Sequence, residues 1–235
     1  MTGTLYLLPV GLGECDLNDV LPQKNFGIIR ELTWFIAENA KEARAFLKQC
    51  AYPEISRAQL SLINQHARQD ELLSFIQPLL QGHNMGLMSD AGCPGIADPG
   101  AEVIRIAHQK GIRVVPLVGP SSIVLSIMAS GFNGQNFAFI GYLPIDKAEK
   151  VKRIKELEQL TIRQKQAQFF IETPYRNQPL FEDLLKTLSP ASKLLIATNI
   201  SLGDESIRVK TIAAWKRAPA PEFHKKPTIF GIYSE

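Results

Sequence analysis

Cysteine is scarce in this sequence of 235 residues, which contains only Cys15, Cys50 and Cys93. The number is odd and no two of them have a CxxC spacing, which argues against a disulfide framework and against a zinc ribbon. The four histidines show no metal-ligand spacing either. We therefore expect a protein of the reducing cytoplasm that holds no metal.

Long apolar runs and a strong excess of one charge are also absent. The start of the chain has no basic region and reaches Pro9 after a short apolar stretch, so we expect this segment to be neither a signal peptide nor a membrane span. The 26 basic and 23 acidic side chains give a net charge of +3, so attraction to nucleic acid would require a local patch. With 45% hydrophobic residues the chain can form one large core or two smaller ones.

Short apolar runs rich in strand-forming residues alternate with stretches of helical spacing. We expect nine strands, at residues 5–10, 34–37, 60–63, 85–88, 114–118, 137–140, 169–171, 194–197 and 229–233. We expect helices at residues 43–50, 70–80, 101–109, 122–130, 147–160 and 179–188. This alternation predicts an α/β protein with mainly parallel sheets.

A segment with two prolines and a glycine, residues 115–120, lies about halfway along the chain. Such a segment is typical of a crossing between domains, although a single nine-stranded sheet is the alternative. We predict two α/β domains, one at residues 1–117 and the other at residues 118–235.

The most unusual stretch is residues 89–100, which holds three glycines, two prolines and two aspartates directly after a predicted strand. Open α/β sheets bind ligands at the carboxyl ends of their strands, where this loop would lie. Glycine allows close backbone approach to a ligand, and proline reduces the entropy cost of holding the loop in one shape. Asp98 and Pro99 are explained by capping of the next helix, but the other ten residues favour a ligand-binding loop.

The end of the first strand invites comparison with a dinucleotide-binding GxGxxG motif. Gly11 and Gly13 fit, but Asp16 stands in place of the third glycine and Pro22 interrupts the helix that should receive the pyrophosphate. Glu38 could serve as the ribose-binding acid of such a site. A dinucleotide-dependent oxidoreductase is therefore the weaker alternative.

Polar residues also follow two elements of the second half. Ser121 or Ser122 can cap the helix at residues 122–130 and also offer a hydroxyl to a ligand. Glu172 and Thr173 follow an apolar strand, where either a ligand contact or a cap for the next helix, by Thr173 or Asn177, explains them. Both interpretations stay open for each pair.

Taken in order, the motifs resemble those of the tetrapyrrole methylase superfamily. Within it, the chain is most similar to the small-subunit ribosomal RNA ribose 2′-O-methyltransferases. The resemblance covers nearly the whole sequence and is carried by residues 3–11, 89–100, 111–121, 130–131, 141–144 and 171–176.

The resemblance implies two α/β domains with S-adenosylmethionine bound in the cleft between them, usually in a homodimer. The positions that match the family's cofactor contacts are Pro9, Asp90, Ala91, Gly92 and Ile96 in the first domain, and Ser121, Ser122, Glu172 and Ala197 in the second. These assignments come from the resemblance alone.

Departures from the family pattern concern the methyl acceptor. The rRNA branch usually carries an asparagine where this chain has Leu12 and an arginine-glutamate pair where it has Thr198-Asn199. It also usually carries an acidic-aspartate-threonine-arginine run where this chain reads Glu-Asn-Ala-Lys at residues 38–41. The acceptor therefore stays open between an rRNA ribose hydroxyl and a small molecule such as a tetrapyrrole. A non-catalytic binding protein is a further hypothesis.

Methyl transfer from a sulfonium depends mainly on holding donor and acceptor in line, which contributes up to ~7 to 11 kcal/mol in well-oriented systems. A ribose hydroxyl is a poor nucleophile and benefits from a general base. Glu38, at a predicted strand end, is our candidate for that base. The structural alternative is an ion pair of Glu38 with Lys41 or Arg44 on the following helix.

Two basic groups are candidates for phosphate contacts. Residues 147–165 hold seven basic and three acidic side chains, and a second group comprises Lys216, Arg217, Lys225 and Lys226. A solvated helix face and a polar loop are the commoner explanations of such patterns, and we favour them.

Overall fold

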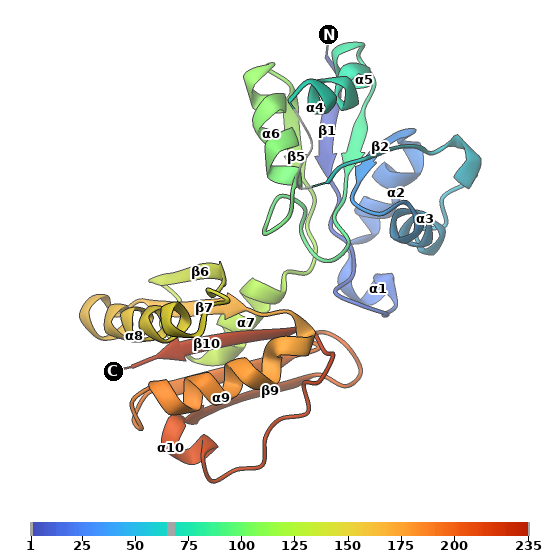
Figure 1. Ribbon diagram of the computed structural model, residues 1–235. Helices are drawn as coiled ribbons and strands as arrows, with labels where there is room; N and C mark the ends of the chain where they lie inside the picture. Colours follow the sequence, from blue (N-terminus) through green and yellow to red (C-terminus); the bar gives the residue numbers. More distant parts are fainter. Residues whose placement is uncertain (1, 65–68, 235) are drawn as a thin grey trace. The chain divides into compact units, whose positions relative to one another are not determined.

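The computed structural model describes residues 2–64 and 69–234 (Figure 1). The chain divides into two compact units, Met1–Ser121 and Ser122–Glu235. Each unit has its own five-stranded sheet and its own hydrophobic core, as an α/β architecture requires. The predicted fold class, with an α/β domain in each half of the chain, is confirmed.

The sheet of the first unit is entirely parallel. Its strands are β1 (Thr4–Leu7), β2 (Trp34–Ala37), β3 (Gln59–Leu62), β4 (Met85–Leu87) and β5 (Arg113–Pro116), in the order β3-β2-β4-β1-β5. Leu5 of β1 pairs with Met85 of β4 on one side and with Val114 of β5 on the other. Because all five strands run in the same direction, their carboxyl ends lie at one edge of the sheet.

Helices cover both faces of this sheet. They are α1 (Leu17–Val20), α2 (Gln23–Glu31), α3 (Ala40–Gln49), α4 (Gln69–Phe75), α5 (Gln77–Leu80) and α6 (Gly100–Gln109), with a 3-10 turn, η1, at Ile55–Arg57. Phe35 of β2 packs into a cluster with α2 and α3, whereas its neighbour Ile36 packs into a second cluster with α4, α5 and α6. Successive side chains of a strand point to opposite faces, so the two clusters lie on opposite sides of the sheet.

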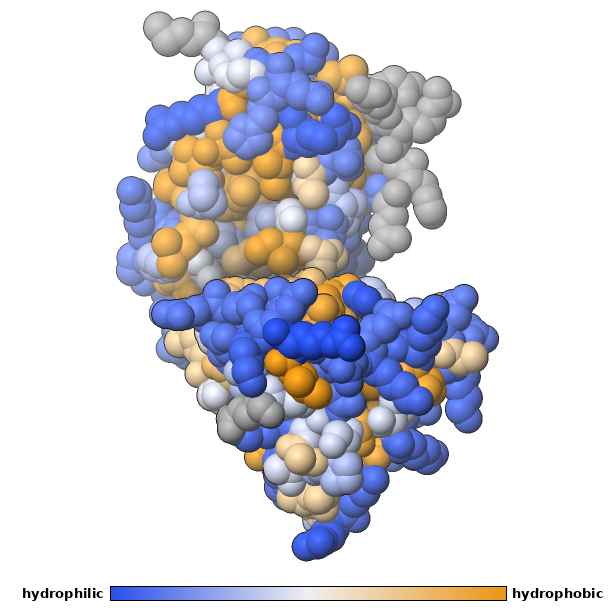
Figure 2. All heavy atoms as spheres, turned by 90° about the vertical axis from the view of Figure 1, so that its left-hand side faces the viewer, coloured by the Kyte–Doolittle hydropathy of each residue, from blue (hydrophilic) through white to orange (hydrophobic). Residues whose placement is uncertain are grey.

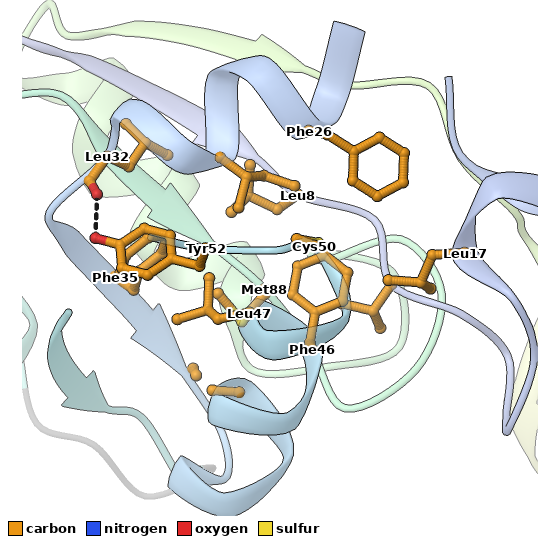
Figure 3. Close-up of a cluster of buried hydrophobic side chains, with 14 of the residues drawn as sticks. Leu8, Leu17, Phe26, Leu32, Phe35, Phe46, Leu47, Cys50, Tyr52 and Met88 are labelled. Carbon is orange, nitrogen blue, oxygen red and sulfur yellow. Dashed lines mark hydrogen bonds between the residues drawn. The ribbon is translucent and has the colours of Figure 1, made fainter. Parts of the chain in front are cut away.

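The cluster on the α2 and α3 side fixes the segments that lead into the predicted ligand loop (Figure 3). The Tyr52 hydroxyl donates a hydrogen bond of 2.5 Å to the Leu32 carbonyl, and the Tyr52 ring packs edge-on against Phe35 with centroids 5.8 Å apart. Leu8 and Met88 belong to the same cluster and are buried. Pro9 and Ser89 follow these two residues directly, so the buried core fixes the positions at which both segments begin.

The sheet of the second unit is mixed. Its strands are β6 (Phe137–Tyr142), β7 (Ala167–Ile171), β8 (Lys193–Thr198), β9 (Ser206–Thr211) and β10 (Thr228–Tyr233), in the order β6-β7-β10-β8-β9. β6 and β7 are parallel, while β10 runs antiparallel to both β7 and β8. β7 and β8 therefore point the same way, and their carboxyl ends share an edge with the start of β10.

The helices of this unit are α7 (Ser122–Ser130), α8 (Lys147–Gln164), α9 (Asn177–Thr187) and α10 (Ile212–Trp215), with a 3-10 turn, η2, at Pro174–Arg176. α8, α9 and α10 supply one core, to which Phe170 of β7 belongs. Phe169 faces the other way and packs against Phe132, which follows α7. In the part of the chain that the structure describes, no helix is both long and apolar enough to span a membrane.

The expectation of mainly parallel sheets is wrong for the second unit. β8 is followed by a short turn and then by β9, which was not predicted, and a connection too short for a crossing helix leaves the two strands antiparallel. The sequence of β9, Ser-Ile-Arg-Val-Lys-Thr, alternates polar and apolar residues as an edge strand does. The expected helices also omitted α1, α2 and α10.

Candidate functional site

The carboxyl edge of the first sheet gathers half of the site residues expected from the sequence. Pro9 follows β1, Glu38 follows β2, and Asp90 to Gly92 follow β4. The Val10 amide donates to the Gly92 carbonyl at 3.0 Å, which ties the segment after β1 to the loop after β4. The ends of three strands thus bring Pro9, Glu38, Asp90, Ala91 and Gly92 together at one edge.

The loop at residues 89–100 is held by its own aspartate. The Asp98 carboxylate accepts from the Gly95 amide at 2.8 Å and from the Gly100 amide at 2.6 Å. Gly100 is the first residue of α6, so the expected capping role of Asp98 is confirmed. Gly92 and Gly95 have φ of +73° and +84°, which side chains other than glycine rarely adopt. Ile96 lies on this loop and is 52% exposed.

Glu38 is half-buried beside this loop. Its Oε1 accepts from the Asp90 amide at 3.4 Å, and among the described residues neither Lys41 nor Arg44 forms an ion pair with it. Burial raises the pKa of Glu38, and the negative charges of Asp90 and Asp98 raise it further. A carboxyl with a raised pKa is a stronger base once ionised, which suits the predicted role.

A pocket of about 420 Å³ opens beside the same loop within the first unit. Its volume falls in the range of ~300 to 1,000 Å³ that is typical of small-ligand sites. The lining comes from the segment after β1, from α3 and from the residues after β4, and includes Leu12, Glu42, Asp90 and Ala91. Burial raises the pKa of Asp90, and the nearby charge of Glu42 adds to the effect.

Cys93 lies inside the loop with its Sγ 3.3 Å from the Pro120 carbonyl oxygen. Burial raises the pKa of its thiol, which keeps it protonated at neutral pH. A protonated thiol that donates to a carbonyl is a packing residue and a poor nucleophile.

The dinucleotide alternative finds no support in the local geometry after β1. Asp16 caps α1 through its carboxylate, which accepts from the Asn18 amide at 2.9 Å. α1 ends at Val20, and α2 begins only after Pro22. A pyrophosphate site needs a longer helix that starts directly at the glycine-rich turn.

In the second unit, Glu172 and Ala197 lie at one edge of the sheet. Ile171 of β7 and Ala197 of β8 both pair with Ile229 of β10, so they stand at the same level on either side of that strand. Glu172 follows Ile171 directly. The expected contact positions on β7 and β8 are therefore two strands apart.

The Glu172 carboxylate is already engaged. Its side chain is 1% exposed, and its Oε1 accepts from the Arg176 guanidinium and from the Thr173 amide, each at 2.7 Å. Thr173 precedes η2, and its hydroxyl accepts from Arg176 Nε at 3.1 Å. Glu172 thus holds the turn after β7 in place.

Ser122 is the first residue of α7, and Ser121 stands directly before it at the end of the first unit. Both are half-buried. Of the two caps considered for the next helix, Asn177 is instead the first residue of α9, and its buried amide donates to the carbonyls of Phe223 and Lys226. Asn177 therefore fastens the loop before β10, a role that its position in the sequence did not reveal.

Thr198 and Asn199 stand where the sequence departs from the family's pattern, and both contact other residues of the second unit. The hydroxyls of Thr198 and Thr228 lie 3.2 Å apart. Asn199 donates to both carboxylate oxygens of Asp204, and Lys226 contacts the same carboxylate at 2.8 Å. Among the described residues, no group of three or more histidine, cysteine, aspartate or glutamate side chains could hold a metal ion.

A substitution at Gly119 tests whether the edge of the first sheet forms a cofactor site. A Cβ at this position would lie 2.2 Å from the Pro9 Cβ, so Gly119→Ala must displace one of the two segments. We expect the free energy of unfolding to fall by ~1 to 3 kcal/mol and the affinity for S-adenosylmethionine to fall about tenfold. Thermal unfolding and calorimetry measure the two effects.

The matched control is Gly134→Ala, because a Cβ at Gly134 would have nothing within 4 Å. It should leave both measurements unchanged. If Gly119→Ala is stable and binds the cofactor with unaltered affinity, Pro9 is not part of the cofactor site.

Comparisons with known proteins show what the whole chain is similar to. No family model matches the chain. Three similar proteins, each named ribosomal RNA small subunit methyltransferase I, come from Leptospira biflexa, Escherichia coli O157:H7 and Bacillus subtilis. Their identities are 27%, 27% and 35%, the matches cover 87%, 91% and 88% of this chain, and they span 80%, 72% and 62% of the respective relatives.

A solved structure, that of the methyltransferase CobJ, has the same fold. The match has a TM-score of 0.66 and covers 99% of this chain and 95% of CobJ, at 17% sequence identity. The fold and the relatives together define a methyltransferase. More particularly, they bear out the resemblance to the tetrapyrrole methylase superfamily that the motifs indicated.

Proposed function

We propose that this enzyme transfers a methyl group from S-adenosylmethionine to a ribose 2′-hydroxyl of small-subunit rRNA in the cytoplasm. The observation that carries the proposal is the convergence of Pro9, Glu38, Asp90 and Gly92 at one sheet edge, in a chain whose relatives are named as methyltransferases of that RNA.

For the cofactor, we propose contact residues within each unit. In the first, these are Pro9, Asp90, Ala91, Gly92 and Ile96, supported by the pocket beside Asp90 and by the glycine backbone of the loop. A carboxylate such as Asp90 can accept hydrogen bonds from hydroxyl or ammonium groups of the cofactor. Ser121, the last residue of the first unit, is a further proposed contact, and those of the second unit are Ser122, Glu172 and Ala197.

Glu172 would act mainly by position. Because its carboxylate is buried and bonded to Arg176 and Thr173, it fixes the backbone after β7 and leaves little of its own surface for a ligand. Its proposed contribution to binding is therefore the shape of that turn.

When bound, the cofactor would supply a methyl group from its sulfonium to the substrate nucleophile and would leave as the thioether S-adenosylhomocysteine. The residues of this chain hold donor and acceptor together and exclude water, which is the larger part of the rate enhancement. Glu38 would accept the proton of the ribose hydroxyl as the new bond forms. Its half-buried carboxylate is held toward the loop by the Asp90 amide.

Two measurements test the proposal in sequence. Calorimetry should show binding of S-adenosylmethionine and S-adenosylhomocysteine and no binding of NAD. Mass spectrometry of small-subunit rRNA from a deletion strain should show the loss of one ribose methylation, restored by the cloned gene. An unchanged methylation pattern with intact cofactor binding would redirect the acceptor to a small molecule, and absent turnover would indicate a binding protein.

The resemblance also leads us to propose a homodimer, which sedimentation velocity on the purified chain checks directly. A monomer at all concentrations would contradict it and leave the chemistry above untouched.

A further inference from the structure

Two exposed tyrosines stand at the functional edge of the second sheet and have no part in the methyl transfer described above. Tyr175 is 71% exposed and Tyr142 is 57% exposed. Tyr142 pairs with Ile171, the residue before Glu172, and Tyr175 lies three residues after Glu172. Both rings are therefore placed beside the turn that we assign to the cofactor site.

The backbone directs Tyr142 outward. The register between β6 and β7 shifts between Phe139 and Tyr142, and Gly141 within this irregularity has a φ of +74°. Bulges of this kind change the direction of a side chain and occur next to binding sites. The exposure of Tyr142 thus follows from a defined feature of the strand.

Tyr175 stands on a rigid support. It is the middle residue of η2, between Pro174, whose ring restricts the backbone, and Arg176. Arg176 is fastened to the buried Glu172 by contacts of 2.7 Å and 2.9 Å. An aromatic ring on such a turn loses little conformational entropy when it binds a flat partner.

A lysine ammonium group lies near the Tyr175 ring. The Lys225 Nζ lies 5.9 Å from the centroid of the Tyr175 ring, within the range of cation–π contacts. The adjacent Lys226 is neutralised by Asp204 at 2.8 Å and lies near the negative charge of Glu222. The loop that carries both lysines is fastened by Asn177. Lys225 is thus the cation that faces the ring, and its exposed ammonium group is accessible to a phosphate.

We propose that Tyr175 and Lys225 form a stacking site for a nucleobase of the RNA substrate. The base would stack on Tyr175 and its phosphate would contact Lys225, with Tyr142 as a second stacking surface. Proteins recognise unpaired RNA bases by this combination of aromatic rings and single cations. The inference rests on the proposed rRNA substrate, and of the second basic group in the sequence it uses Lys225 alone.

The test compares the methylation kinetics of variants on small ribosomal subunits from the deletion strain. Loss of one stacked base weakens binding by roughly tenfold, so Tyr175→Ala should raise KM about tenfold with kcat within about twofold. Tyr175→Phe should resemble the wild type, because the ring is retained. Lys225→Gln should lower the slope of log KM against log salt by about one.

Two controls are matched to these changes. Phe137→Ala removes a 44% exposed ring from the opposite end of β6. Lys165→Gln removes an exposed lysine whose φ of 52° is close to the 59° of Lys225, so it repeats both the loss of charge and the change in backbone strain. Neither should change KM by more than about twofold or reduce the salt dependence as Lys225→Gln does.

Ultraviolet cross-linking gives an independent readout. The bound subunit should yield an RNA-linked peptide that contains Tyr175, and this adduct should disappear in Tyr175→Ala. An unchanged KM and no adduct, in a wild type that methylates the subunit, would overturn the stacking site and leave the proposed function intact. A wild type that binds S-adenosylmethionine but does not methylate the subunit would instead overturn the proposed function.

Discussion

Glu38→Gln is expected to lower kcat about a hundredfold and to leave the affinity for S-adenosylmethionine unchanged. General bases contribute ~10² to 10⁴-fold to rates of this kind, and a glutamine cannot accept the proton of a ribose hydroxyl. The glutamine keeps an oxygen that can accept from the Asp90 amide, as Glu38 does at 3.4 Å. Single-turnover rates and calorimetry on the two proteins measure the two quantities.

The pH dependence gives this prediction a second readout. Burial, and then the charges of Asp90 and Asp98, raise the pKa of Glu38, so the wild-type rate should rise with pH up to that raised pKa and then level off. The residual rate of Glu38→Gln should lack this acid limb. A variant whose rate falls but keeps the limb would assign the base to another residue.

The contribution of Glu38 to folding stability should fall as pH rises, whereas the catalytic rate should increase. A carboxyl with a pKa raised in the folded state binds its proton more tightly there than in the unfolded chain. Its stabilising contribution is therefore present at low pH and is lost as pH rises from the unfolded pKa through the raised folded one. At neutral pH, Glu38→Gln should unfold at the same temperature as the wild type or higher.

Glu31→Gln is the matched control, since Glu31 is an exposed carboxylate at the end of α2 in the same unit. It should leave the rate, the pH profile and the unfolding temperature unchanged. A wild-type rate in Glu38→Gln would show that orientation alone suffices for the transfer and that Glu38 is only a structural acid.

The sequence predicts those elements whose pattern is complete within a few residues. The strand at Trp34–Ala37 and the helix at Ser122–Ser130 have the predicted bounds. The first strand was expected to reach Val10 but ends at Leu7. Pro9 has no amide to donate, and Val10 leaves the sheet to bond to Gly92, a partner that lies far away along the chain.

The site is predictable in part for the same reason. Strand ends can be read from local patterns, and these place Glu38, Asp90 and Glu172 at edges of sheets. Neither the order of strands in a mixed sheet nor a bulge such as the one before Tyr142 follows from local patterns. The bonds of Asn177 to a loop more than forty residues away, which position Lys225, arise only from tertiary structure.

The second large effect is expected in the turn after β7. Glu172→Ala should lower the free energy of unfolding of the second unit by about 3 kcal/mol. The Glu172 side chain is 1% exposed, and its carboxylate accepts hydrogen bonds from the Thr173 amide and the Arg176 guanidinium. The change removes this acceptor from both donors. An unsatisfied buried donor costs ~1 to 3 kcal/mol, and loss of one partner of a buried ion pair costs ~3 to 5 kcal/mol. Arg176 is 39% exposed, so water compensates part of its loss.

Such a loss corresponds to a fall of roughly 10 °C in the unfolding temperature of a domain of this size. The unfolding temperature of Glu172→Gln should fall by less, because the amide oxygen of glutamine can still accept a hydrogen bond from the Thr173 amide. Glu182→Ala is the control: Glu182 also pairs with a cation four residues away, but its side chain is 51% exposed and its contact with Lys186 is 3.9 Å long. Exposed pairs of this kind contribute ~0 to 1 kcal/mol, so its unfolding temperature should stay close to that of the wild type.

Cofactor affinity then separates the two roles of Glu172. If the residue acts by shaping the turn, Glu172→Ala should weaken S-adenosylmethionine binding at temperatures where the protein is folded, and Glu172→Gln should restore most of the affinity. If its carboxylate touches the cofactor directly, the glutamine variant should remain as weak as the alanine variant while its stability recovers. The buried position of the carboxylate and its bonds to Arg176 and Thr173 favour the first result.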